Sequence, residues 1–105
     1  MESPPECSDE TTTGEDDATL HLNDNVFSPG CLILLGGQAL ELENEGLNRH
    51  NFSIEGTDVD IDVDADRDTR TEPIGTLAEA GEHTFFCKYH RSLGMEGEIT
   101  IVEAG

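Results

Sequence analysis

The C-terminal quarter of this sequence places a cysteine, a histidine and a methionine close together. His90 follows Cys87 by three positions, and Met95 follows His90 by five. A second histidine, His50, stands upstream in the segment RHNFSI. Two imidazoles, a thiolate and a weak axial thioether suit copper, because the sulfur ligands stabilise Cu(I) and the imidazoles support Cu(II). The four residues therefore predict one type 1 copper site.

The segments around these residues predict an all-β protein. Short apolar or alternating stretches are separated by Gly, Asn and Pro, which is typical of strands joined by turns. About seven to eight short strands indicate a Greek-key β-sandwich or barrel, in which the loop from Cys87 to Met95 could meet a neighbouring strand carrying His50. We expect strands near residues 19–22, 31–35, 39–43, 50–55, 58–66, 70–78, 83–87 and 98–102, with Pro73 at an edge or bulge.

The chain divides by composition into two parts. Residues 1–17 are rich in acids, Pro and Thr, without an apolar period, and predict a flexible leader. Residues 18–105 predict one copper-binding domain of ordinary size. The leader could be the linker from a membrane anchor, a hypothesis that the full-length gene would test.

The formal net charge is -19, from 24 acidic residues and only five Lys or Arg. Such a surface repels nucleic acid phosphates and anionic lipid, so neither is an expected partner. The longest apolar run, residues 31–35, is too short to cross a bilayer. An acidic leader that keeps the chain soluble explains only part of the charge, because acids continue through the rest of the chain. A basic docking partner and a salty habitat both remain open as reasons for the rest.

Three cysteines leave two after Cys87 is assigned to the metal. Cys7 and Cys31 could form a disulfide, which would contribute about 3 kcal/mol by restricting the unfolded chain. Such a bond would place the protein outside a reducing cytosol. Alternatively, Cys31 is a small buried hydrophobe and Cys7 a loose thiol.

Two other metal sites deserve comparison with copper. Asp60, Asp62 and Asp64 have the spacing of the first ligands in a calcium loop, but Ala65 and Thr71 stand where that loop needs Gly and Glu. A strand with one solvated face explains the alternating acids better. Zinc would accept Cys and His, but it rarely takes an axial Met. Neither remaining histidine is expected to bind metal. His21 lies on the first expected strand with no partner motif, and His83 shares the strand parity of Phe85 and Cys87, so it is expected to face the core.

The ligand segment resembles the copper loop of plastocyanins, within the cupredoxin family. Residues 81–103, GEHTFFCKYHRSLGMEGEITIVE, contain C-x-x-H-x-x-x-x-M at the spacing of that family. RHNFSI resembles its Pro-His-Asn segment, and FSPGCLILLGGQALELENEG resembles its earlier strands. The resemblance covers roughly residues 19–103, closely over the two ligand segments and loosely elsewhere.

The resemblance implies roles for individual residues. His50, Cys87 and His90 would be equatorial ligands and Met95 the axial one. The backbone N–H of Asn51 would tune the sulfur of Cys87, and its side chain would hold the loops together. The ring edge of His90, within an apolar patch that includes Leu93, would be the point where electrons enter or leave.

Three residues depart from the plastocyanin pattern. Arg49 and Tyr89 replace prolines beside the two histidines, and Phe86 replaces a Tyr that serves as a second electron port. The resemblance therefore implies a plastocyanin-like relative rather than a photosynthetic plastocyanin.

The expected function is transfer of single electrons between larger redox proteins, with copper cycling between Cu(II) and Cu(I). The alternative is a copper carrier or sequestering module, although the chain lacks a Met-rich tract. We expect no enzyme, because no second histidine cluster or nucleophile motif accompanies the site. We expect a monomer in the periplasm or at the cell surface, whose partner is a basic cytochrome or a terminal oxidase. A membrane tether in the full-length protein stays open.

Overall fold

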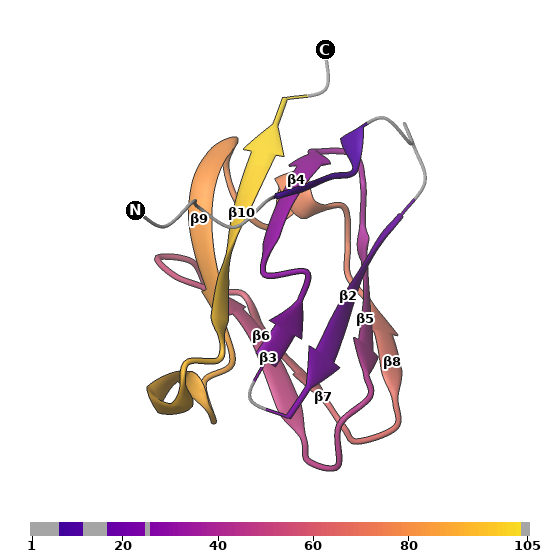
Figure 1. The fold of residues 1–105 in the computed structure, drawn as a ribbon. Coiled ribbons are helices and arrows are strands. Elements are labelled where there is room, and N and C mark those ends of the chain that lie inside the picture. The colour runs from indigo at the N-terminus through magenta and orange to yellow at the C-terminus, as the bar shows by residue number, and fades with distance from the viewer. Residues whose placement is uncertain (1–6, 12–16, 25, 104–105) are drawn as a thin grey trace.

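The computed structural model describes residues 7–11, 17–24 and 26–103, and within them the strands form two sheets (Figure 1). Sheet A has the order β1-β4-β10-β9-β6-β7, and sheet B has the order β3-β2-β5-β8. The strands are β1 (Ser8–Asp9), β2 (Ala18–Asn23), β3 (Val26–Ser28), β4 (Cys31–Leu35), β5 (Leu40–Asn44), β6 (His50–Ile54), β7 (Asp60–Val63), β8 (Asp68–Arg70), β9 (Gly81–Phe86) and β10 (Glu96–Val102).

The core lies between the two sheets and follows from the alternation of side chains along the strands. In β2 and β5, every second residue is buried, and these positions are mainly leucines. They pack in one cluster with residues of sheet A such as Phe52, Phe85 and Ile99. An apolar face against the opposite sheet and a polar face outside is the arrangement that a period of two produces.

The sheet topology brings distant segments to the ligand loop. β9 pairs with β10 on one side and with β6 on the other, both antiparallel. The turn after β9 and the loop before β6 consequently lie at the same end of the sandwich (Figure 1). The predicted all-β Greek-key sandwich is confirmed by this two-sheet arrangement.

The expected strand at 70–78 is wrong. The strand β8 ends at Arg70, and Ile74–Thr76 form a short 3-10 helix, η2, instead. The Ile74 side chain is fully buried, and the N–H of Gly75 donates to the carbonyl of Gly36 at 2.8 Å. A Cβ on Gly75 would lie 2.9 Å from that same oxygen. Burial of one side chain and close backbone contact thus favour a turn here over an extended strand.

Part of the expected leader belongs to sheet A. Ser8–Asp9 form β1, which pairs in parallel with β4, and a disulfide joins Cys7 to Cys31. Order in the described residues therefore begins before Ala18, the start expected from composition. The division between a leader at 1–17 and a domain at 18–105 remains a prediction, because most of the leader lies outside the described residues.

Candidate metal centre

Three of the four predicted ligands lie at the ends of neighbouring strands. His50 is the first residue of β6, Cys87 follows the last residue of β9, and Met95 immediately precedes β10. His90 lies between them, just before the 3-10 helix η3 (Arg91–Leu93). Strand ends are rigidly placed by their ladders, so the fold fixes these positions with little freedom left to the loop.

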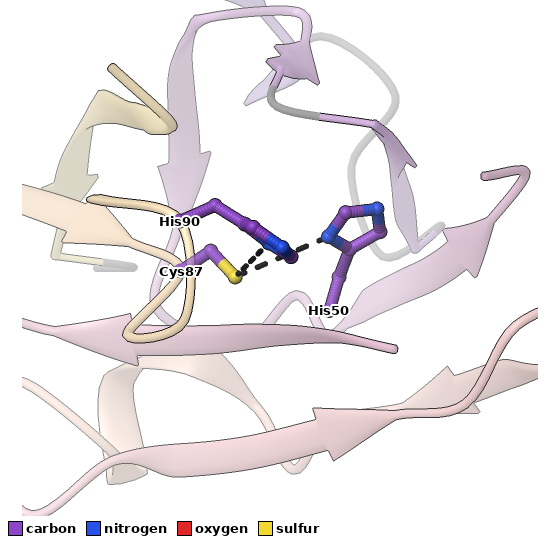
Figure 2. Close-up of side chains that lie close together, drawn as sticks. All are labelled: His50, Cys87 and His90. Atoms are coloured by element: carbon purple, nitrogen blue, oxygen red, sulfur yellow. Dashed lines mark hydrogen bonds between the residues drawn. The ribbon is translucent and has the colours of Figure 1, made fainter. Parts of the chain in front are cut away.

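Two imidazoles converge on the thiol of Cys87 (Figure 2). The Nδ1 atom of His50 lies 4.0 Å from Cys87 Sγ, and the Nδ1 atom of His90 lies 3.5 Å from it. His50 and Cys87 are buried, whereas His90 is half-buried. Met95, the last residue before β10, is fully buried.

These separations fit a bound metal ion. Metal bonds of about 2.0–2.3 Å to nitrogen and sulfur, spread at trigonal angles, separate ligand atoms by roughly 3.5–4 Å. All three donor atoms lie within 4.8 Å of one another. Two imidazoles and a thiolate, together with a thioether such as that of the buried Met95 in the same loop, form a donor set that suits copper in both oxidation states.

Backbone hydrogen bonds shape the loop from Cys87 to Met95. The N–H of Cys87 donates to the carbonyl of Met95 at 3.0 Å, which closes the loop at its base. The N–H of His90 donates to Cys87 O at 3.1 Å, and the N–H of Met95 donates to His90 O at 3.3 Å. Gly94 ends η3 with a φ of 91°, a left-handed conformation that favours glycine.

The side chain of Asn51 connects the loop to β7. Its Oδ1 accepts hydrogen bonds from the Lys88 N–H at 3.2 Å and from the Ser53 hydroxyl at 2.6 Å. Its Nδ2 donates to Asp60 at 2.6 Å and to Asp62 at 3.0 Å. Asn51 is fully buried, so these four bonds satisfy its amide without water.

Asp60 and Asp62 also hold the exposed side chains of the ligand loop. The Lys88 ammonium lies 3.0 Å from Asp60, and the Tyr89 hydroxyl donates to Asp62 at 3.0 Å. The hydrogen bonds from Lys88 and then from Asn51 lower the pKa of Asp60 below its ordinary value. The alternating aspartates are exposed, as a solvated strand face requires, but two of them have partners in the metal centre.

A carboxylate contacts His50 on the side away from Cys87. Asp24 Oδ1 lies 3.1 Å from His50 Nε2. Burial lowers the pKa of His50, and the hydrogen bond with Asp24 opposes that effect. Partial burial acts to raise the pKa of Asp24, but its hydrogen bonds outweigh burial and leave that pKa lowered.

The surface around His90 carries both apolar and charged groups. Leu93, expected in an apolar patch there, is 64% exposed, and Tyr89 is 44% exposed. Asn48, Arg49, Asp64, Tyr89 and His90 line a shallow hollow. Of the three residues whose donor atoms converge, His90 is thus the one that solvent can reach.

Some residues at the site were not foreseen from the sequence. The sequence pattern indicates no role for Asp24, and it favours a solvated strand face over a calcium loop for Asp60 and Asp62. Their contacts span sequence separations of 9 to 28 residues, which no local pattern reveals. His21, expected to have no metal partner, lies 3.6 Å from Glu43 in β5 and 3.3 Å from Glu45, which follows β5. All three side chains are partly exposed.

Comparisons with known proteins identify the family. The model of the cupredoxin-like domain matches residues 6–101, so the chain belongs to the cupredoxin family. Plastocyanin A/B of Petroselinum crispum is 29% identical over 100 residues, which cover 88% of this chain and 98% of that protein. Plastocyanin of Daucus carota is 28% identical over the same shares.

Solved structures share the fold. A mutant plastocyanin of a fern has a TM-score of 0.66 at 17% identity, covering 81% of this chain and 100% of that chain. Amicyanin from Paracoccus versutus has a TM-score of 0.64 at 14% identity, covering 82% and 81%. A copper-containing nitrite reductase from Thermus scotoductus has a TM-score of 0.65 at 19% identity, covering 85% of this chain but 23% of that chain.

The family match and the converging donor set confirm the class predicted from the sequence. The protein is a plastocyanin-like cupredoxin, a small blue-copper electron carrier with one copper. Within the described residues, no helix is long and apolar enough to cross a membrane.

Proposed function

We propose that this protein passes single electrons between larger redox proteins, with His50, Cys87, His90 and Met95 holding its copper. The observation that carries the proposal is the approach of both Nδ1 atoms to the one free thiol among the described cysteines, at 4.0 and 3.5 Å. When bound there, copper supplies a one-electron couple between Cu(II) and Cu(I).

The chain holds these donors in place before any electron arrives. His50 begins a strand that is buried along its whole length, and Cys87 is tied to Met95 through the backbone. Asn51 binds the N–H of the residue after Cys87. A donor set fixed by strands and hydrogen bonds rearranges little between oxidation states, which favours fast electron transfer. A bond from the Asn51 N–H to the sulfur remains a prediction.

We propose the ring edge of His90 as the point of electron entry and exit. His50 and Cys87 are buried, whereas His90 is half-buried and is flanked by the exposed side chains of Tyr89 and Leu93. A partner that covers this surface comes closest to the donors through His90. Phe86 lacks the hydroxyl of a second port, so we place the exchange at His90 alone.

We propose a basic, extracytoplasmic partner and no catalytic role for the chain itself. The net charge of -19 attracts cationic surfaces over distances of about 10 Å at moderate salt. The disulfide between Cys7 and Cys31 suits a compartment outside a reducing cytosol. The match covers only 23% of the nitrite reductase that shares the fold, so the activity of that enzyme does not transfer to this chain.

A visible absorption spectrum with Cu(II), before and after ascorbate, tests the site. We expect an intense thiolate-to-copper band that bleaches on reduction and returns on oxidation. The same measurement on Cys87→Ser should show no such band. Tight copper binding with weak absorption would instead indicate a copper carrier and would reject Cys87 as a ligand.

Electron-transfer kinetics test the partner. We expect the rate with a basic cytochrome to fall as ionic strength rises, because salt screens the attraction between opposite charges. An acidic cytochrome should react slowly at low salt and faster at high salt. A rate with the basic protein that does not depend on salt would refute steering by the acidic surface.

A further inference from the structure

We propose that Asp24 is a positioning residue of the metal centre: its carboxylate orients His50 and stabilises the oxidised state. This inference rests on the proposed function of His50 as a ligand. Asp24 lies in the turn after β2, at the end of sheet B, whereas His50 begins β6 in sheet A. The contact therefore joins the two sheets at the metal centre.

The hydrogen bond selects one form of the imidazole. The His50 side chain is fully buried, with Nδ1 facing Cys87 Sγ and Nε2 facing Asp24 Oδ1 at 3.1 Å. A neutral imidazole has one N–H and one lone pair, and an ionised carboxylate can only accept. The proton of His50 must then lie on Nε2. This leaves the lone pair of Nδ1 facing Cys87 Sγ, where it can bind a metal ion held between the two residues.

The carboxylate is itself held in position. Asp24 Oδ1 accepts hydrogen bonds from the Leu47 N–H at 3.1 Å and from the Asn48 side chain at 3.4 Å. Its side chain is 38% exposed, so water screens its charge only in part.

Gly46 provides independent evidence that the chain accommodates this contact. A Cβ on Gly46 would lie within 2.4 Å of Asp24 Oδ1 and within 2.9 Å of His50 Nε2. Both values are shorter than real Cβ contacts, so with any side chain at this position the carboxylate or the ring would have to shift. The loop before His50 thus leaves room for the pair only because residue 46 is glycine.

The contact should favour Cu(II) over Cu(I) for two reasons that act together. A carboxylate that accepts from the distal nitrogen makes the imidazole a stronger donor, and such partners change metal affinity by about 10- to 100-fold. A negative charge near the site also stabilises the more positive ion. We expect Asp24→Asn to reduce the ratio of Cu(II) to Cu(I) affinity by about tenfold, which raises the reduction potential by about 59 mV.

Three variants separate charge, hydrogen bond and general surface effects. Asp24→Asn keeps an oxygen that can accept from Nε2 but removes the charge. Asp24→Ala removes both. Asp58→Asn is the control, because it removes the same charge far from His50. Asp58 lies in the turn between β6 and β7, next to the pair Ser53–Asp60, whereas His50 pairs with Val63 at the opposite end of this hairpin.

Two measurements on these variants test the proposal. Nitrogen-15 NMR of the copper-free protein reports which ring nitrogen of His50 is protonated. We expect the Nε2–H form in the wild type and in Asp24→Asn, and a mixture of both forms in Asp24→Ala. Voltammetry of the copper-loaded proteins should show a higher reduction potential in both Asp24 variants than in the wild type. For Asp58→Asn, the ratio of Cu(II) to Cu(I) affinity obtained from the potential should change less than twofold.

The outcomes distinguish this inference from the proposed function. If the potentials of both Asp24 variants match that of Asp58→Asn, Asp24 is only a surface acid and the inference is overturned. The same follows if Asp24→Ala keeps the Nε2–H form as the wild type does. Should Asp24→Ala not fold, the potential of Asp24→Asn decides alone. A wild-type protein without a blue band would refute the proposed function instead.

Discussion

Replacing Asn51 by Ala should destabilise the copper-free protein by about 3 kcal/mol. Asn51 is fully buried, and its amide makes four hydrogen bonds, to Ser53, Lys88, Asp60 and Asp62. Truncation removes all four and leaves a cavity of polar lining. The two aspartates are partly exposed and regain water, so their loss is the smaller part.

Most of this loss of stability comes from the hydrogen bonds of Lys88 and Ser53 to Asn51, because water replaces these two bonds less well than those to the aspartates. The Lys88 N–H and the Ser53 hydroxyl each lose an acceptor, at about 1 kcal/mol per neutral hydrogen bond. The two bonds to carboxylates add roughly 1 kcal/mol between them after rehydration. With a urea m-value of about 1–1.5 kcal/mol/M for a chain of this size, the unfolding midpoint should fall by roughly 2–3 M.

Urea unfolding of Asn51→Ala and Ser53→Ala, alone and combined, measures this effect. Ser53→Ala is the matched control, because it removes one bond of the same network and should lower stability by about 1 kcal/mol. In the Asn51→Ala background the Ser53 substitution should have little effect, since its partner is already gone. A loss below about 1 kcal/mol for Asn51→Ala, or full additivity of the two changes, would refute the reasoning.

Two further predictions concern stability. Replacing both Cys7 and Cys31 by Ser should lower the free energy of unfolding by about 3 kcal/mol, because the disulfide restricts the unfolded chain over 24 positions. Urea unfolding measures this loss. The copper-loaded variant should keep its blue absorption band. The lowered pKa of Asp60 means that its ionised form stabilises the folded state above the ordinary value of 3.8, and that this contribution disappears as pH falls through the lower folded pKa. Asp60→Asn should therefore flatten the loss of copper-free stability below pH 4, and an unchanged acid profile would contradict the assignment.

The sequence predicts the ligand loop well because its information is local. Cys87, His90 and Met95 lie within one short loop, and strands flank it on both sides with clear alternation. The core strands can be predicted in the same way, since the alternating positions of β2 and β5 are mainly leucines, which require a buried face. The prediction of a strand at 70–78 is wrong because Ile74 is buried although it lies in the short helix η2. A buried apolar residue gives the same sequence signal in a turn as in a strand.

The sequence could not predict the contacts that depend on sheet order. Asp24 meets His50 only because the end of sheet B lies beside the start of β6, and a turn of Asn and Asp has no feature that names its partner. β1 was missed for a similar reason. Two residues in an acidic segment form a strand because the disulfide and β4 hold them, not because of their own propensity.

The contacts of the ligand loop also bear on the meaning of the high negative charge. Three of the five cations, Arg49, Lys88 and Arg91, are paired with acids on β7 or beside the loop. The surface around His90 therefore carries three of the five cations, each held in an ion pair, while most of the 24 acids lie elsewhere on the chain. A partner that approaches His90 closely then removes little water from unpaired charges. The remaining acids act at longer range, where screening by salt is strong. On this argument, salt should change how often a basic partner arrives more than how tightly it fits at His90.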